Sequence, residues 1–160
     1  MKTLIKIYLL LVVLILLSAC TPAINIQFTS SAYINPDFKN RALPTLLRIY
    51  QLSQATSFND ATFHQLWLND EQILGASLIK RQEFELNPNS TITVKVVPEI
   101  NTHYLGIIAL YRNPKHSRWR LIKIMPNSMS AVFSHISIKV SGDTLTFIND
   151  NQDANNGNNT

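Results

Sequence analysis

Short segments with alternating apolar and polar residues follow one another along most of this chain, separated by turn residues. Ile24, Ile26 and Phe28 alternate with polar neighbours, and a period of two is typical of a half-buried β-strand. The pattern predicts strands at 24–29, 45–52, 78–86, 91–96, 104–111, 119–124, 136–140 and 145–147, with turns at 87–89 and 141–143. About eight such strands without internal repeats favour an all-β fold, a two-sheet antiparallel β-sandwich.

The segment 104–111 is apolar at every position. A strand of this kind should be covered on both faces. One face can meet the opposing sheet, and a helical insertion after the second strand can cover the other. A second short helical piece within that insertion is expected to begin at Asp70-Glu71 and to end at Gly75.

The first helical piece is indicated by Phe63, Leu66 and Trp67, which fall at i, i+3 and i+4. This spacing places the three side chains on one face of a helix. Asn59 or Asp60 is the expected N-cap. The fold prediction is therefore a sandwich with one or two short helices after the second strand.

The N-terminus carries an export signal. Lys2 and Lys6 come before an apolar stretch at 7–17, which closes on a Leu-Ser-Ala-Cys sequence ending at Cys20. This sequence resembles the lipobox of bacterial lipoproteins, in which the Cys is acylated, with palmitate as a typical fatty acid, and becomes the new N-terminus. The alternatives are an ordinary signal peptide and a membrane-spanning anchor, but the apolar stretch is short for ~30 Å of hydrocarbon.

Four parts of the chain are therefore expected. They are a signal peptide at 1–19, an acylated N-terminus and short tether at 20–23, the sandwich domain at 24–148, and a disordered tail at 149–160. The tail is almost wholly Asn, Asp, Gln and Gly, which is too polar to form a core. Thr21 follows Cys20, and the absence of Asp there favours the periplasmic face of the outer membrane over the inner membrane.

Charge and cysteine content narrow the functional classes. The formal net charge is +4, and removal of the two signal-peptide lysines lowers it to +2. A charge this small does not indicate a nucleic-acid-binding protein. Cys20 is the only cysteine. Once it carries a lipid, the domain has neither a disulfide nor a free thiol, and the covalent lipid is the only attached group expected. No other cofactor is expected.

The order of these features resembles one family of secretion lipoproteins. A lipobox and a first strand are followed by a loop that ends Arg-x-x-Pro at Pro44, then by Leu-Arg-Ile-Tyr-Gln-Leu at 47–52. This succession resembles TssJ, the lipoprotein of the bacterial type VI secretion system. The resemblance implies a transthyretin-like sandwich anchored in the outer membrane. It also implies that the protein docks the periplasmic end of TssM, an IcmF-like inner-membrane protein that shares its complex with TssL.

In this family the loop between the first two strands contacts TssM, and by position that loop is 35–43 here. The implied partner-binding residues are Asn35, Pro36, Asp37, Phe38, Lys39, Asn40 and Arg41. Family members often have Gly where this chain has Asn40, but Asn tolerates left-handed backbone better than most residues. Phe38 is the strongest candidate, because aromatic residues are enriched at interface hot spots; folding back onto the sandwich is the alternative.

Groups that could support catalysis or metal binding do not converge in the sequence. Glu99 and His103 are four residues apart, a possible metal pair on a helix, but Pro98 and the adjacent strand argue against a helix there and no third ligand lies near. His64 and His135 are expected to be surface or structural residues. The serines at 128, 130 and 134 lack a G-x-S-x-G setting. Neither an enzyme nor a metal site is expected.

Two other readings stay open. The basic turn at 115–120 could bind an acidic partner or lipid headgroups, or could simply be a solvated turn. The rival to docking is a lipoprotein that binds a small molecule or carbohydrate. That rival requires a pocket lined by exposed aromatic residues, whereas Phe84, Trp119, Phe133 and Phe147 are expected in the core.

Overall fold

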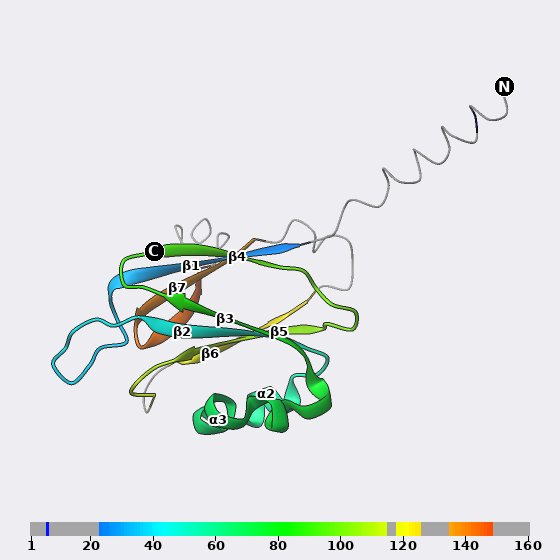
Figure 1. Ribbon diagram of the computed structural model, residues 1–160, viewed down its shortest axis with the longest axis horizontal. Helices are drawn as coiled ribbons and strands as arrows, with labels where there is room; N and C mark the ends of the chain where they lie inside the picture. Colours follow the sequence, from blue (N-terminus) through cyan, green and yellow to red (C-terminus); the bar gives the residue numbers. More distant parts are fainter. Residues whose placement is uncertain (1–5, 7–22, 115–117, 126–134, 149–160) are drawn as a thin grey trace, which may run out of the picture.

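The computed structural model describes Lys6 and residues 23–114, 118–125 and 135–148, called the described residues below. Their strands form two four-stranded sheets packed face to face (Figure 1), with the orders β4-β1-β7-β8 and β3-β2-β5-β6. The strands are β1 (Ile24–Ile34), β2 (Thr45–Leu52), β3 (Leu78–Leu86), β4 (Thr91–Val96), β5 (Tyr104–Leu110), β6 (Arg120–Ile124), β7 (His135–Gly142) and β8 (Thr144–Ile148). The predicted all-β sandwich is confirmed.

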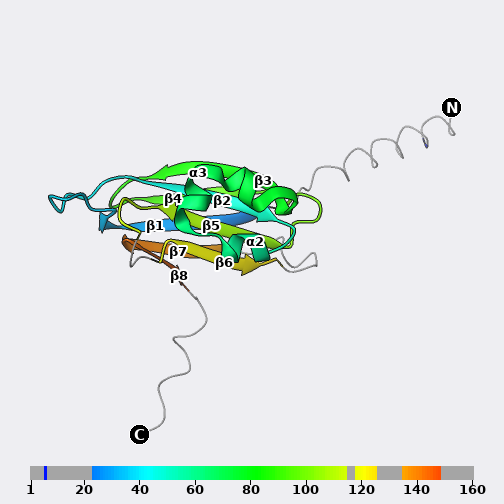
Figure 2. The same ribbon diagram turned by 90° about the horizontal axis from the view of Figure 1, so that it is seen from below.

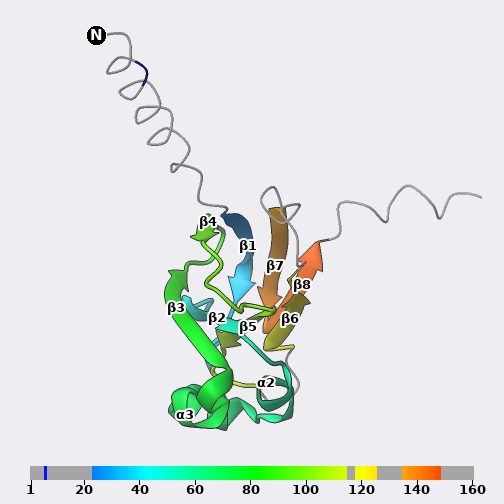
Figure 3. The same cartoon turned by 90° about the vertical axis from the view of Figure 1, so that its right-hand side faces the viewer.

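The helices follow β2, as predicted, and lie on the outer face of the second sheet (Figure 3). They are α2 (Thr56–Asp60), α3 (Phe63–Leu74) and the 3-10 turn η1 (Gly75–Ser77). None of the helices among the described residues is both long enough and apolar enough to cross a membrane.

The strand pairing departs from the prediction at one place. All other neighbouring strands are antiparallel, but β1 pairs with β7 in parallel, with Ile26 opposite Ile136 and Phe28 opposite Ile138. A parallel pair needs a long connection, and nearly the whole domain lies between these two strands. Alternation within a segment gives no information on strand direction, so the sequence could not predict this pair.

The first strand is also longer than predicted. Its alternation ends near Ser31, yet β1 continues to Ile34, which pairs with Gly142. The register shifts between Ser30 and Ile34. A bulge or similar irregularity places an extra residue in one strand and interrupts the period of two, which is why the sequence pattern breaks before the strand does.

The apolar strand β5 is covered on both faces, as predicted. Leu105, Ile107 and Ala109 belong to the core between the sheets, whereas Ile108 belongs to a second cluster beneath the helices. The packing on the helix side is close at Gly106, where a Cβ would lie 2.8 Å from the ring of Phe58.

The helix boundaries correct one detail of the prediction. Asn59 and Asp60 belong to α2, and α3 is capped instead by Thr62, which forms a reciprocal capping box with Gln65. The helix is kinked at Asn69, where φ is −138°, so that a second segment begins at Asp70. It ends, as expected, at Gly75, whose φ of 48° suits glycine.

A buried carboxylate fastens α3 to the sheet. Asp70 accepts hydrogen bonds from Tyr50 Oη (2.9 Å) and from Arg81 Nη1 (2.9 Å to each oxygen), and pairs with Arg48 Nη1 at 3.3 Å. Arg48 Nη1 also donates to the carbonyl of Leu66 at 2.8 Å. The side chains of Asp70 and Arg48 are 6% and 12% exposed, so this network joins α3 to β2 and β3 with little access to water.

The network also sets the ionisation of Asp70. Burial disfavours the charged carboxylate, but the hydrogen bonds from Arg81 and Tyr50 and the nearby charge of Arg48 outweigh it. The pKa of Asp70 therefore lies below its ordinary value.

We expect Asp70→Ala to lower the free energy of unfolding by roughly 2–4 kcal/mol, because it leaves Arg48 and Tyr50 without their buried partner. Chemical denaturation followed by circular dichroism measures this loss. Asp60→Ala, at the exposed end of α2, is the matched control and should change stability by less than ~0.5 kcal/mol. Equal effects of the two variants would contradict the network.

The same carboxylate should contribute to acid sensitivity. A lowered folded-state pKa gives stability that is present above the unfolded value of about 3.9 and lost as the pH falls through the folded value. Asp70→Asn should therefore lower the free energy of unfolding near neutral pH. On acidification, the free energy of unfolding of this variant should fall by less than that of the wild type.

Candidate functional site

The loop between β1 and β2, residues 35–44, projects from one end of the sandwich (Figures 1 and 2). Its base is fixed by Asn35, which is buried with a left-handed φ of 44°. The Asn35 N–H donates to the carbonyl of Gly142 (2.7 Å) and its side-chain amide donates to the carbonyl of Pro44 (2.8 Å). Its side-chain oxygen accepts from the N–H of Arg112 (2.9 Å). Asn35 thus ties the loop to both sheets.

Asp37 organises the tip of the β1–β2 loop. Its carboxylate accepts from the N–H groups of Lys39 (2.8 Å) and Arg41 (2.9 Å) and from Arg41 Nε (2.8 Å), with Arg41 Nη2 at 2.7 Å. The Asp37 N–H donates in turn to the carbonyl of Arg41 at 3.0 Å. These bonds, led by the one from the Arg41 N–H, lower the pKa of Asp37 below its ordinary value.

Asn40 adopts the left-handed backbone that this turn requires. Asn40 has a φ of 59°, in the left-handed region, and its N–H donates to the carbonyl of Asp37 at 2.9 Å. Its side-chain oxygen accepts from Tyr33 Oη at 3.4 Å. The expectation that Asn can supply this conformation is confirmed.

The braced loop presents Phe38 to solvent. This side chain is 85% exposed, and the ammonium of Lys39 lies 5.5 Å from its ring centre. Phe38 does not fold back onto the sandwich, so the alternative role for it is wrong. The predicted residues thus divide by position: Asn35 and Asp37 are buried and shape the loop, whereas Phe38, Lys39 and Asn40 face outward.

Arg41 both faces solvent and helps to shape the loop. Its side chain is 68% exposed, yet its guanidinium is held by Asp37. A partner that contacts Arg41 therefore meets a cation whose position is already set.

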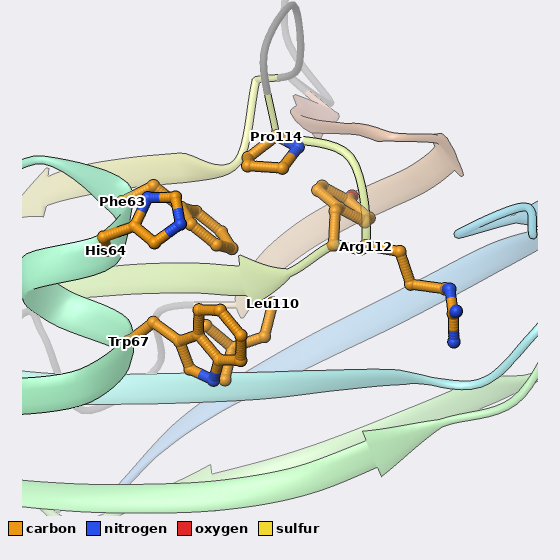
Figure 4. A pocket seen from close by; sticks show the side chains of 7 residues that line it. Phe63, His64, Trp67, Leu110, Arg112 and Pro114 are labelled. Carbon is orange, nitrogen blue, oxygen red and sulfur yellow. The ribbon is translucent and has the colours of Figure 1, made fainter.

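Beside the loop lies a groove of about 390 Å³ that the sequence reasoning missed (Figure 4). Its walls are Phe63, His64, Trp67, Leu110, Tyr111, Arg112 and Pro114. Trp67 was expected to share the buried face of α3 with Phe63 and Leu66, but it is 46% exposed and forms part of this wall. An aromatic residue at the margin of a helical stripe was the only signal for it.

The groove meets the first requirement of the small-molecule rival, since aromatic side chains line it. A binding pocket also needs polar groups that converge on a ligand. The guanidinium of Arg112 extends away from His64 and Trp67 (Figure 4). Among the described residues that line it, the groove therefore has an apolar wall and no convergent polar set.

The other residues considered for catalysis or metal binding lie apart from one another. Glu99 accepts from Lys80 Nζ at 2.5 Å, and the described residues contain no group of three His, Cys, Asp or Glu side chains that could hold a metal. His64, His103 and His135 are exposed. The serines at 128, 130 and 134, Phe133, the tail and Cys20 lie outside the described residues.

Part of the basic turn at 115–120 can be placed. Arg120 stacks over Trp119 at 4.9 Å, and its Nη1 donates to the carbonyls of Phe58 (3.1 Å) and Ala61 (2.8 Å). Arg120 therefore holds α2 against the sheet. Residues 115–117 lie outside the described residues.

Comparisons with known proteins agree on the family. The model of the family described as type VI secretion lipoprotein (VasD, EvfM, TssJ) matches residues 22–143. A comparison with curated protein sequences finds no match.

Solved structures share the fold. The type VI lipoprotein TssJ1 from Pseudomonas aeruginosa is 25% identical, with a TM-score of 0.73 over 81% of this chain and 96% of that one. Lip from Serratia marcescens, a membrane-bound component of the type VI secretion system, is 21% identical, with a TM-score of 0.71 over 81% and 100% of the two chains. A chain in the structure of the C-terminal domain of TssM from EAEC is 22% identical, with a TM-score of 0.66 over 79% and 98%.

The family match covers most of the chain, and it spans the braced β1–β2 loop and the strands from β1 to β7. This β-sandwich protein belongs to the TssJ family of type VI secretion lipoproteins.

Proposed function

We propose that this protein is an outer-membrane lipoprotein that docks the periplasmic end of a TssM-like inner-membrane protein, without catalysis, in a membrane complex that also contains TssL. The observation that carries the proposal is the exposed Phe38 on a loop fixed by Asn35 and Asp37. Anchoring at the periplasmic face of the outer membrane would occur through a lipid on Cys20.

The shape of the β1–β2 loop favours docking over a merely solvated turn. A protein pays an entropic cost when a mobile loop becomes ordered on binding. Here the bonds to Asp37 and Asn35 fix the loop before any partner arrives. An exposed aromatic ring beside two cations offers the residue types that are enriched at interface hot spots.

We expect Phe38→Ala to weaken binding to the soluble periplasmic end of TssM by roughly 1–3 kcal/mol, because it removes the apolar anchor of the loop. Isothermal titration calorimetry measures this change. The melting temperature should stay the same, since the ring contributes little to the core. Ile100→Ala is the matched control, because Ile100 is 86% exposed on a turn at the opposite end of the sandwich.

Full affinity of Phe38→Ala would move the interface away from the β1–β2 loop. Loss of affinity in Trp67→Ala instead would place the interface at the groove beside it. If the wild-type protein does not bind TssM at all, while a small molecule or carbohydrate protects Trp67 from iodide quenching, the ligand-binding rival would replace docking.

We expect Asp37→Ala to weaken the same binding although Asp37 itself is buried. The variant frees the N–H groups of Lys39 and Arg41 and releases the Arg41 guanidinium, so the loop loses its fixed form. Hydrogen exchange of residues 37–41 should speed up while that of β2 stays unchanged. Slow exchange at residues 37–41 in the variant would show that Asp37 does not brace the loop.

The low pKa of Asp37 gives this effect a pH signature. The brace is intact above the ordinary aspartate value of about 3.9 and is lost as the pH falls through the lower folded value. Wild-type exchange at residues 37–41 should therefore be slow from neutral pH down to about 4 and accelerate only in stronger acid, after correction for intrinsic rates.

The lipid anchor is tested through Cys20. The thiol is the acylation site of a lipobox, so Cys20→Ser should leave the precursor unprocessed and without lipid. Labelling of cells with an alkyne fatty acid measures acylation. Equal labelling of the Cys20→Ser variant would refute the anchor, and Ser18→Ala, also within the lipobox, should retain the label as a control.

A further inference from the structure

The end of the sandwich opposite the β1–β2 loop carries exposed aliphatic side chains. Ile100 is 86% exposed, Ile124 is 71% exposed and Val97 is 40% exposed. They lie where β1 begins: Val96 pairs with Ile24, the first residue of β1, and Ile124 ends β6 opposite Tyr104. Figure 1 shows the connection between β4 and β5 at this end, far from the β1–β2 loop.

The turn that carries Ile100 has a fixed conformation. Thr102 N–H donates to the carbonyl of Glu99 (3.1 Å), and Asn101 has a φ of 67°, as in a type II turn. The buried side chain of Gln51 accepts from Glu99 N–H (2.7 Å) and Thr102 Oγ1 (2.9 Å). Gln51 also donates to the carbonyl of Val97 at 3.0 Å. Ile100 is therefore held in solvent by a buried side chain, and its exposure does not come from a loose loop.

Val97, Ile100 and Ile124 are called the aliphatic tip below. Three lysines lie close to it, each near the end of its strand. Lys95 pairs with Asn25, Lys80 with Gln51 and Lys123 with Leu105, each next to the last pair of its strands. All three lysines are exposed, but the ammonium of Lys80 pairs with Glu99 at 2.5 Å, so Lys95 and Lys123 are the cations left for lipid. Lysine side chains can extend along an apolar surface while their ammonium groups reach lipid phosphates. An aliphatic tip with a cationic collar matches the layered chemistry of a membrane interface.

The short connection between Cys20 and β1 would keep this end of the sandwich close to the membrane that holds the proposed lipid anchor. Three residues separate Cys20 from Ile24, and even when fully extended they span only about 10 Å. A lipid on Cys20 therefore holds the start of β1, and with it Val97, close to the bilayer surface.

We propose that Val97, Ile100 and Ile124, with the collar of Lys95 and Lys123, form a second contact with the anchoring membrane and set the orientation of the domain. This inference rests on the lipid anchor of the proposed function and adds a contact by the folded domain itself. The aliphatic tip enters the interfacial layer of the bilayer while the lysines bind lipid phosphates. The β1–β2 loop at the opposite end then points away from the membrane, toward the periplasm.

The test uses the full acylated lipoprotein in vesicles of phosphatidylethanolamine and phosphatidylglycerol. Single cysteines at Ile100→Cys and Ile124→Cys are labelled with a polarity-sensitive nitrobenzoxadiazole dye; acylated Cys20 has no free thiol to compete. The control sites are Leu68→Cys on α3 and Phe38→Cys on the β1–β2 loop, both of which replace exposed apolar residues. Quenching by nitroxide-labelled lipid reports contact with the bilayer, and quenching by iodide reports contact with water.

Nitroxide lipid should quench the dye at positions 100 and 124 several-fold more than at positions 68 and 38, with iodide showing the reverse order. With a dye at Val97→Cys, the added Ile100→Glu change should lower the lipid quenching several-fold without altering the circular dichroism spectrum. Equal quenching by iodide at positions 100 and 68 would overturn the second contact.

The outcomes separate this inference from the proposed function. Protein that fails to float with the vesicles would refute the lipid anchor and the membrane contact together. Protein that floats and binds the TssM domain, but shows no lipid quenching at positions 100 and 124, would refute the membrane contact alone.

Discussion

The arrangement of the molecule depends on a strand that must be buried on both faces. Leu105 and Ile107 of β5 face the opposing sheet, while Ile108 lies beneath the helices and Gly106 allows Phe58 to approach. An apolar strand with one face in water would leave a large apolar surface exposed. The helical insertion after β2 covers that face, and the buried Asp70 network fixes α3 there through Arg48 and Arg81.

Placing both helices on one face leaves the two ends of the sandwich free for different tasks. The end with the β1–β2 loop offers an exposed aromatic ring on a backbone braced by Asp37. The opposite end, where β1 begins, offers the aliphatic Ile100 and Ile124 with lysines behind them. In each case a buried polar side chain, Asp37 or Gln51, holds an apolar residue in solvent. In the proposed arrangement one end meets the membrane and the other meets TssM.

Much of the fold could be predicted, because alternation and turn residues are local properties of the sequence. The bounds of β2, β3 and β4 were predicted correctly, as were the Gly75 helix end and the left-handed conformation at Asn40. The β1–β2 loop was singled out through a family resemblance and an isolated aromatic residue. The roles within the loop could not be predicted, because only the folded backbone brings the N–H groups of Lys39 and Arg41 onto one carboxylate.

The sequence by itself determined the class of fold and the order of strands and helices. It also predicts an export signal and limits the distance between Cys20 and the first strand. These follow from periodicity, composition and chain length, which need no knowledge of distant contacts. Only the tertiary structure decided the parallel pairing of β1 with β7, the position of Trp67 in a groove, and the gathering of Val97, Ile100 and Ile124 at one end. The reason is physical: strand direction and the shared exposure of distant residues come from long-range packing, which no local pattern encodes.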